Sequence, residues 1–385
     1  MEWLFPIIEW VIKALVLIFA LLGGFAYLTW YERRALARMQ VRLGPNRAGP
    51  EGLLQPIADA IKLIFKEELI PDRAERILFI LAPVLVVVPA VVITATVPWG
   101  PDIPLQAIGI PYTIKPYIAD INVGVLYITA IASIAVYGIV LAGWSSDNKF
   151  AMLGGLRATA QMVSYELSLG FSFVVVILLA GSMNMIEIVE AQRVPLLDLG
   201  IIQIPTWYTF VQPVGMVIFM IATLAELNRA PFDMPEAEQE LTAGYMTEYS
   251  GMKFALFFMG EYTKMIAISA IAAALFFGGY HGPFVDQFPI LGPVYMVLKI
   301  IVILFWMIWV RATWPRIRYD RLMAFGWKVM LPLSLAVVMI TAFGIVLGAS
   351  FGPLAQAGFT FVISLSVGFL VTVLIDRALR RKMYA

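Results

Sequence analysis

Nine apolar runs, each long enough to cross a lipid bilayer as a helix, constrain this chain more than any other feature of its sequence. A transmembrane helix needs about 20 mostly apolar residues, because the hydrocarbon core is about 30 Å thick and each residue rises about 1.5 Å. We therefore predict an all-α polytopic membrane protein, with residues 1–385 forming a single transmembrane domain of about nine helices. The runs lie near residues 10–31, 76–98, 121–143, 159–181, 209–228, 254–278, 290–311, 327–349 and 355–376.

Basic residues concentrate in alternate loops and predict the orientation of the chain. The loops after the first, third, fifth and seventh runs, with the adjoining ends of the runs and the C-terminal tail, hold 22 of the 27 Lys and Arg residues. The intervening loops hold Lys115 and Arg193. Because cytoplasmic loops carry the excess of Lys and Arg, we expect the N-terminus outside and the C-terminus in the cytoplasm. The main cytoplasmic loops are then residues 32–75, 229–253 and 312–326.

The composition excludes several classes of redox and binding protein. The chain has no cysteine and one histidine, His281, so it lacks ligand sets for iron–sulfur clusters, structural zinc or bis-histidine haem. We therefore expect this chain to bind no metal and no cofactor of its own. Its net charge of +1 also argues against nucleic acid as a partner, because phosphate binding needs a dense basic surface.

The loop at 32–75 contains the sequence LLQPIADAIKLIFKEELIP, at residues 53–71, which predicts an amphipathic helix lying on the membrane surface. Ile57, Ile61 and Phe65 share one face of this helix, and Asp59 and Lys62 lie on the opposite face. An interfacial anchor needs a polar face but does not need an acid beside a base. Anchoring and a functional role therefore both remain open for this segment.

Three glutamates lie within the apolar runs and close to their expected cytoplasmic ends: Glu166, Glu226 and Glu261. An acid in lipid costs about 2.5–3.5 kcal/mol, so such residues usually face protein or water and often mark ion pathways. The alternatives are that Glu226 reaches the interface and that the other two form interhelical hydrogen bonds. Lys264 and Lys299 lie deeper. We expect Lys264 to pair with Glu261, three residues earlier, and Lys299 to find its partner on another span or another chain.

The most acidic stretch, AELNRAPFDMPEAEQELTAGYMTEY at residues 225–249, follows the fifth run. Asp233 and Glu236 resemble a capping box, so part of this acidity is typical of a helix start. The crowding of like charges should also raise the pKa of some of these carboxyls toward neutrality. Groups of this kind are suited to passing protons.

Four long polar blocks in this otherwise apolar sequence carry a resemblance to a known family. They are YERRALARMQVRLGPNRAGPEGLLQPIADAIKLIFKEE at 31–68, GGLRATAQMVSYE at 154–166, AELNRAPFDMPEAEQELTAGYMTEYSG at 225–251 and RATWPRIRYDRLMAFGWKVMLP at 311–332. The chain resembles the family of quinone-chamber membrane subunits, the H subunits, of proton-pumping NADH:quinone oxidoreductase, respiratory complex I. This resemblance extends from the first run to the eighth, and the ninth run and the tail lie outside it.

The resemblance implies a helical subunit at the junction of the membrane and peripheral arms, whose cytoplasmic loops form the membrane-side part of a quinone chamber. The residues implied for the chamber are Arg33, Arg34, Asp59, Lys62, Phe65, Arg229, Phe232 and Asp233. Those implied for coupling to proton movement are Glu32, Glu166, Glu226, Glu236, Glu238, Glu240, Glu248 and Glu261, with Lys264 and Lys299 as intramembrane bases.

The resemblance also implies partners and a location. Quinone would be the substrate, and flavin and iron–sulfur clusters would belong to partner subunits of the peripheral arm. Small and antiporter-like subunits would adjoin the chain in the membrane arm, and the membrane would be the bacterial inner membrane. Because the third run has no internal acid, a continuous acidic route would have to bypass that helix.

Other functions remain open at this point. A related subunit serves in hydrogenase- or ferredoxin-linked membrane complexes, where the acceptor would differ. A secondary ion transporter would also explain buried acids and lysines, but no motif repeats between the halves of the chain, as such folds commonly show. A purely structural role is disfavoured by the cost of placing three acids in the membrane.

Overall fold

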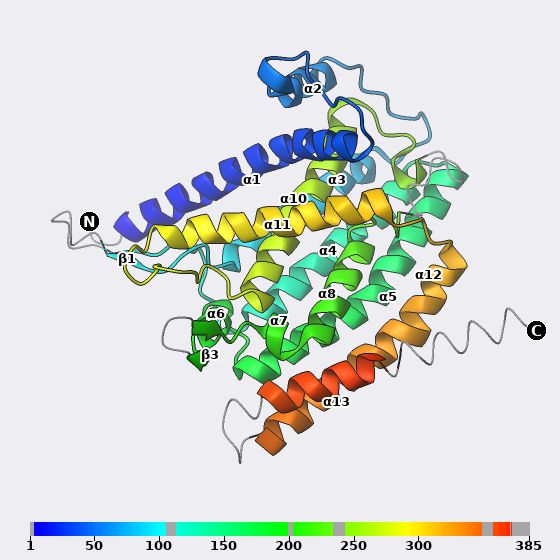
Figure 1. The fold of residues 1–385 in the computed structure, drawn as a ribbon. Coiled ribbons are helices and arrows are strands. Elements are labelled where there is room, and N and C mark those ends of the chain that lie inside the picture. The colour runs from blue at the N-terminus through cyan, green and yellow to red at the C-terminus, as the bar shows by residue number, and fades with distance from the viewer. Residues whose placement is uncertain are drawn as a thin grey trace, which may run out of the picture.

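The computed structural model describes residues 4–104, 113–198, 203–233, 243–348, 357–369 and 371 (Figure 1). In this part of the chain, seven helices are long and apolar enough to cross a membrane. Two shorter apolar helices, Pro213–Glu226 and Ala357–Phe369, lie where the fifth and ninth spans were expected. The prediction of an all-α polytopic membrane protein is confirmed. The long helices are α1 (Leu4–Met39), α3 (Arg76–Val92), α4 (Gly124–Ser145), α5 (Lys149–Ala180), α10 (Gly251–Phe276), α11 (Leu291–Thr313) and α13 (Leu331–Gly348).

Shorter elements connect these helices. The short α-helices are α2 (Gln55–Ile64), α6 (Met185–Ala191), α7 (Tyr208–Val211), α8 (Pro213–Glu226) and α12 (Tyr319–Phe325). Single turns are η1 (Pro50–Gly52), η2 (Ile93–Thr96), η4 (Gly244–Met246) and the π-helical η5 (Gly326–Met330). Two antiparallel strand pairs complete the set: β1 (Ile103–Pro104) with β2 (Thr113–Ile114), and β3 (Pro195–Asp198) with β4 (Gln203–Pro205).

Helix α10 lies at the centre of the bundle. Its residues from Tyr262 to Phe276 are all buried, as expected of a helix that is apolar around its whole circumference. It packs against α1, α3 and α11, while α5 packs against α4, α8 and α13 (Figure 1). The bundle therefore places the acids of α5, α8 and α10 in its interior.

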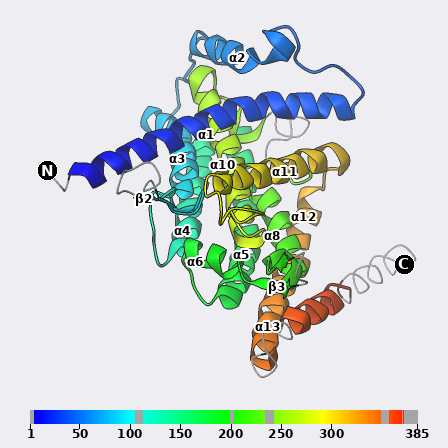
Figure 2. The same cartoon turned by 60° about the vertical axis from the view of Figure 1, so that its left-hand side comes forward.

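Helix α1 is longer than a membrane span requires. Its 36 residues rise about 54 Å, against a hydrocarbon core of about 30 Å, so the helix must tilt or project beyond the core. It runs beside α11 along one side of the bundle, and α2 lies beyond α1 at the edge of the molecule (Figures 1 and 2). Below, the side of the bundle on which α2 lies is called the α2 side.

The loop between α1 and α2 is closed by glycines in conformations that other residues avoid. Gly52 has a φ of +77°, and a Cβ atom there would lie 2.2 Å from the carbonyl oxygen of Pro45. A side chain at this position would clash with the backbone, so the sequence GPNRAGPEG folds as one tight unit. This unit brings α2 back over the end of α1.

Candidate functional site

Four charged residues meet on the α2 side of the bundle: Glu32 and Arg229 are buried, Glu261 is largely buried, and the side chain of Arg311 is 38% exposed. Arg229, three residues after α8, places its Nη1 atom 2.7 Å from Glu32 Oε1 on α1 and its Nε atom 2.5 Å from Glu261 Oε1 on α10. Arg311, in the last turn of α11, also pairs with Glu32. Two acids and two bases thus balance within one site, which a low-dielectric interior requires. We call Glu32, Arg229, Glu261 and Arg311 the Arg229 cluster.

An aromatic ring and a glutamine hold Arg229 and its loop in place. The guanidinium carbon lies 4.5 Å from the ring centroid of Tyr262, a distance typical of a cation–π contact. Gln161 on α5 donates from its Nε2 atom to the carbonyl oxygens of Ala225 at 2.8 Å and Phe232 at 2.9 Å. These two bonds close the loop against α5. Phe232 is 1% exposed, so it supports the site from inside rather than lining an open surface.

Asp233 extends the charged site toward the basic loop. Its Oδ2 atom accepts a hydrogen bond from Arg316 at 3.0 Å, and its Oδ1 atom is buried without a hydrogen-bond partner. Burial raises the pKa of the Asp233 carboxyl above its ordinary value, although Arg316 acts in the opposite direction. A carboxyl in this state is able to hold a proton closer to neutral pH than an exposed aspartate can.

Lys264 lies one turn deeper on α10 and pairs with Glu226 at the end of α8. The ammonium nitrogen is 2.9 Å from Glu226 Oε1, and the side chains are 9% and 6% exposed. We expected Lys264 to pair with Glu261, and this expectation was wrong. Residues three apart on a helix differ in direction by about 60°, which is enough for the two side chains to face different neighbours. Glu226 is buried, so the alternative that it reaches the membrane interface is excluded.

Glu166 on α5 lies close to the pair of Lys264 and Glu226. Its Oε1 atom accepts a hydrogen bond from the hydroxyl of Ser133 on α4. Glu166, Glu226 and Lys264 line one small cavity of about 30 Å³, together with Thr129 and Thr223. That is room for about one or two water molecules. Although α4 carries no acid, its Thr129 lines this cavity and the hydroxyl of its Ser133 donates to Glu166.

The chamber residues expected on α1 and α2 form a separate, more exposed group. Arg33 Nη1 lies 2.7 Å from Asp59 Oδ2, and Lys62 Nζ lies 3.6 Å from Asp59 Oδ1. Burial alone would raise the pKa of Asp59, but hydrogen bonds from Arg33 and Gln55 hold it below its ordinary value. Phe65, just after α2, is 84% exposed. These residues tie α2 to the end of α1.

Arg34 faces a cavity of about 560 Å³ beside the end of α1. Its guanidinium donates to the Glu51 carbonyl oxygen and pairs with the Glu51 carboxylate, both at 2.7 Å. Trp30, Tyr31 and Phe305 provide apolar walls, and Arg38 adds a second base. Arg229, Phe232 and Asp233 do not line this cavity. Arg33, Asp59, Lys62 and Phe65 do not line it either, so the expected chamber residues fall in three groups: Arg34 at the cavity, the exposed residues around Asp59, and Arg229 with Phe232 and Asp233.

The remaining expected residues differ in how they are placed. Asn148 donates from its Nδ2 atom to Glu248 Oε1 at 2.6 Å, which attaches the acidic loop to the start of α5. Glu236, Glu238 and Glu240 lie outside the described residues. Lys299 was expected to find its partner on another span or another chain, and in the described part of the chain its partners are backbone carbonyl oxygens at the end of another helix, α10. Its ammonium donates to the carbonyl oxygens of Phe277, Gly279 and His281 at 2.6–2.8 Å. Lys299 thereby caps the end of α10.

Sequence reasoning did not single out several residues of this site. Arg311 and Arg316 were counted only as basic loop residues, and Ser133 was not considered. Arg311 and Arg316 belong to the polar block RATWPRIRYD, which was the available signal. Ser133 has no such signal, because serine is common in apolar helices. Among the described residues, no group of three or more His, Cys, Asp or Glu side chains is placed to hold a metal ion.

Comparisons with known proteins match nearly the whole chain. A family described as NADH dehydrogenase matches residues 12–342. The H subunit of the NADH-quinone oxidoreductase of Thermomicrobium roseum is 49% identical over 341 residues, covering 89% of this chain and 97% of the relative. The H subunit of Rhodospirillum rubrum is 50% identical, with coverage of 88% and 95%, and an H subunit of Geobacter sulfurreducens is 47% identical, with coverage of 87% and 94%.

Proposed function

The chain belongs to the NADH dehydrogenase family that matches residues 12–342, and on this premise we propose that it is the quinone-chamber membrane subunit of a proton-translocating NADH:quinone oxidoreductase. Its α2-side loops form the membrane-side part of the chamber. Its buried acids couple quinone reduction to proton movement. Flavin and iron–sulfur clusters belong to partner subunits, and this chain contributes residues rather than a redox centre.

The row of buried charges that leads from the α2 side into the membrane carries this proposal. It begins at the Arg229 cluster, continues at the pair of Lys264 and Glu226, and reaches Glu166 beside the 30 Å³ cavity. Burying several ion pairs costs free energy that apolar side chains of the same size would not cost. Such a row therefore favours a function that uses the charges.

The chemistry that this chain supports is electrostatic. A quinone that accepts two electrons from a partner subunit takes up two protons to become a quinol. The Arg229 cluster places carboxylates and guanidinium groups on the α2 side, where this reaction takes place. In a medium of low dielectric constant, a change of one charge there alters the proton occupancy of neighbouring carboxyls. The change in proton occupancy passes from Glu261 to Glu226 and then to Glu166. In the loop, we expect the acids at positions 236, 238 and 240 to change their proton occupancy as well.

The substrate binds at a part of the chain separate from the row of buried charges. The cavity at Arg34 combines two bases with the aromatic side chains of Trp30, Tyr31 and Phe305. Arginines suit the polar quinone ring, and the aromatic walls suit the first part of its apolar tail. The Arg33–Asp59 pair fixes α2 over this region. Peripheral-arm subunits complete the chamber over α2, and the small and antiporter-like subunits continue the proton route.

Isolation of the native complex through an affinity tag on this chain tests the proposal. We expect flavin- and iron–sulfur-containing subunits to co-purify and the preparation to reduce quinone with NADH. Purification with hydrogenase subunits, or without any redox subunit, would contradict it. The α2 side is proposed to face the cytoplasm of a bacterial inner membrane, in line with the distribution of Lys and Arg.

A further inference from the structure

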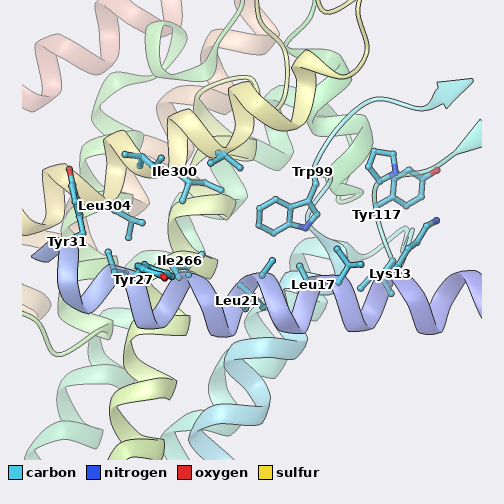
Figure 3. Close-up of a pocket in the computed structure, with 18 of the residues that line it drawn as sticks. Lys13, Leu17, Leu21, Tyr27, Tyr31, Trp99, Tyr117, Ile266, Ile300 and Leu304 are labelled. Atoms are coloured by element: carbon cyan, nitrogen blue, oxygen red, sulfur yellow. The ribbon is translucent and has the colours of Figure 1, made fainter. Parts of the chain in front are cut away.

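Helix α10 borders two cavities that differ in their chemistry. The first, of about 720 Å³, lies along α1, and none of the described residues that line it is an Asp or Glu (Figure 3). The second, of about 30 Å³, is lined by Glu166, Glu226 and Lys264. An acid at membrane depth is costly unless polar groups or water face it. The groups that support the acids of the charge row are therefore those at the small cavity.

Glu166 differs from the other two membrane-depth acids in the kind of partner that it has. Glu226 and Glu261 each pair with a basic side chain from another element. Among the described residues, Glu166 forms no ion pair, and its Oε1 atom accepts a hydrogen bond from the hydroxyl of Ser133. A basic side chain only donates, so it favours the ionised form of an acid. A hydroxyl both donates and accepts, so it can bond to either form.

The hydroxyl of Ser133 has two acceptors within reach. Its Oγ atom lies 3.0 Å from the carbonyl oxygen of Thr129, one turn earlier on α4, and it is also in hydrogen-bond contact with Glu166 Oε1. A serine hydroxyl carries one hydrogen and two lone pairs, so it donates to one of these oxygens at a time. Its lone pairs stay available to a donor. Ser133 can therefore serve as donor or as acceptor for Glu166.

A serine in an apolar helix often bonds only to the backbone of its own helix. Thr159 on α5 illustrates that simpler arrangement, because its hydroxyl donates to the carbonyl oxygen of Gly155 at 2.8 Å. Ser133 differs in having a second partner on another helix, 33 residues away in the sequence. Thr129, on the same helix as Ser133, lines the small cavity together with Glu166. The hydroxyl groups of α4 thus lie where Glu166 meets the charge row.

We propose that Ser133 is a positioning residue that keeps the carboxyl of Glu166 at the small cavity in both of its protonation states. The inference rests on the proposed role of Glu166 in coupling quinone reduction to proton movement. While Glu166 is ionised, Ser133 donates its hydrogen to Oε1. Once Glu166 is protonated, its carboxyl donates to Oγ, and the hydrogen of Ser133 turns to the carbonyl oxygen of Thr129.

The exchanged proton and the hydrogen of Ser133 remain distinct throughout. The proton is added to Glu166, or removed from it, on the side of the cavity. The hydrogen of Ser133 stays bonded to Oγ and only rotates. The carboxyl of Glu166 therefore changes its charge without leaving the cavity.

Two variants of equal shape test this role in the intact complex. Ser133 is half-buried; Ser133→Thr keeps its hydroxyl, whereas Ser133→Val has the shape of threonine without it. Ser133→Ala removes the hydroxyl without adding a methyl group. The control is Thr159→Val, which removes a half-buried hydroxyl that donates to its own helix. Quinone-linked turnover and the KM for quinone are measured over a range of pH, together with electron transfer from NADH to a hydrophilic acceptor.

We expect Ser133→Val and Ser133→Ala to lower turnover by about fivefold, which corresponds to the loss of one hydrogen bond. The factor should be similar on the acidic and the alkaline side of the pH profile, because the hydroxyl serves both forms of Glu166. The KM for quinone and the reduction of the hydrophilic acceptor should not change. Ser133→Thr and Thr159→Val should behave like the unmodified complex.

Unchanged turnover in Ser133→Val and Ser133→Ala would overturn the proposal. So would a loss confined to one side of the pH profile, or an equal loss in Ser133→Thr. Glu166→Gln separates this proposal from the function on which it rests. Normal turnover in Glu166→Gln would contradict the coupling role of Glu166 itself. Slow turnover in Glu166→Gln with normal turnover in Ser133→Val would contradict only the role of Ser133.

Discussion

The guanidinium of Arg229 lies 2.7 Å from the carboxylate of Glu32, and the two side chains are 8% and 2% exposed. This pair joins the loop after α8 to α1, across 197 residues of the sequence. With Glu261 and the partly exposed Arg311 it brings two negative and two positive charges together. Because of this arrangement, removing the charge of one residue leaves its partner's charge without compensation.

Glu32→Gln should therefore destabilise the complex strongly, because it leaves the buried Arg229 with Glu261 as its remaining acidic partner and removes the ion-pair partner of the more exposed Arg311. Removing one partner of a buried pair costs roughly 3–5 kcal/mol. The control is Glu68→Gln, which removes the partner of Lys253 at a site where the glutamate is 46% exposed and about 1 kcal/mol or less is expected. Thermal unfolding of the purified complexes measures the difference, and equal melting temperatures would refute the dependence.

Close backbone packing predicts a second effect on stability. A Cβ atom at Gly154 on α5 would lie 2.6 Å from the Cα atom of Gly244, at the end of the acidic loop. Gly154→Ala should therefore push that loop away from α5 and cost roughly 1–3 kcal/mol. Gly170→Ala is the control on the same helix, because no atom beyond the neighbouring part of its own helix lies within 4 Å of its Cβ position. It should be neutral or slightly stabilising, since alanine favours a helix over glycine. Thermal melting compares the two variants, and a Gly154→Ala complex that melts no lower than Gly170→Ala would contradict the packing argument.

Quinone reduction should depend on Arg34 and Asp59, whereas earlier electron transfer should not. Arg34→Ala removes a base from the 560 Å³ cavity, and Asp59→Ala releases Arg33 and α2 from each other. We expect NADH:quinone reductase activity to fall by about tenfold, or ~1.4 kcal/mol. Electron transfer from NADH to a hydrophilic artificial acceptor should persist. Both activities are assayed on the intact complex. An equal loss of the two would contradict a role of Arg34 and Asp59 in the quinone chamber.

Two introduced cysteines test the orientation of this cysteine-free chain. Arg47 precedes α2 and Gln287 lies between α10 and α11, and both side chains are exposed. Arg47→Cys should react with a membrane-impermeant maleimide only from the cytoplasmic side, and Gln287→Cys only from the outside. The glycines nearby are poor choices, because a Cβ atom at Gly282 would lie 2.6 Å from the ring of Tyr295. Labelling of both cysteines from the same side would overturn the proposed topology.

The length of the apolar runs made the helices predictable, because the bilayer sets the length of any helix that crosses it. The same argument could not predict that α1 continues to Met39, eight residues beyond the expected end of its run. The polar residues of that extension pair with Glu51 in the following turn and Asp59 on α2, which only the folded chain brings near. The short strand pairs in the connecting loops were likewise absent from the prediction.

The residues of the site were easier to predict than their partners. Acids within apolar runs are conspicuous, so Glu166, Glu226 and Glu261 could be selected from the sequence alone. Pairing depends on which helix faces which, and helical periodicity does not contain that information. Lys264 was therefore assigned to the wrong acid, and the three carbonyl oxygens that accept hydrogen bonds from Lys299 could not be named from the sequence.

Glu226 has a structural role, as the partner of Lys264, and a proposed role in proton transfer, and an experiment must separate the two. Glu226→Gln leaves the ammonium of Lys264 buried without a counter-charge, so a loss of assembly would say nothing about protons. Glu226→Gln with Lys264→Met removes both charges, and replacing a whole buried pair is often neutral for stability. The double variant should therefore assemble, and electron transfer from NADH to a hydrophilic acceptor should persist in it.

Quinone-linked turnover and proton pumping in the assembled Glu226→Gln, Lys264→Met complex test the coupling role most directly. Glutamine and methionine cannot carry a proton, and loss of a proton-transferring group typically lowers rates by about 100-fold or more. We predict that both turnover and pumping fall on that scale, with Glu226→Asp retaining more of each. Near-normal turnover and pumping in the assembled double variant would contradict the account.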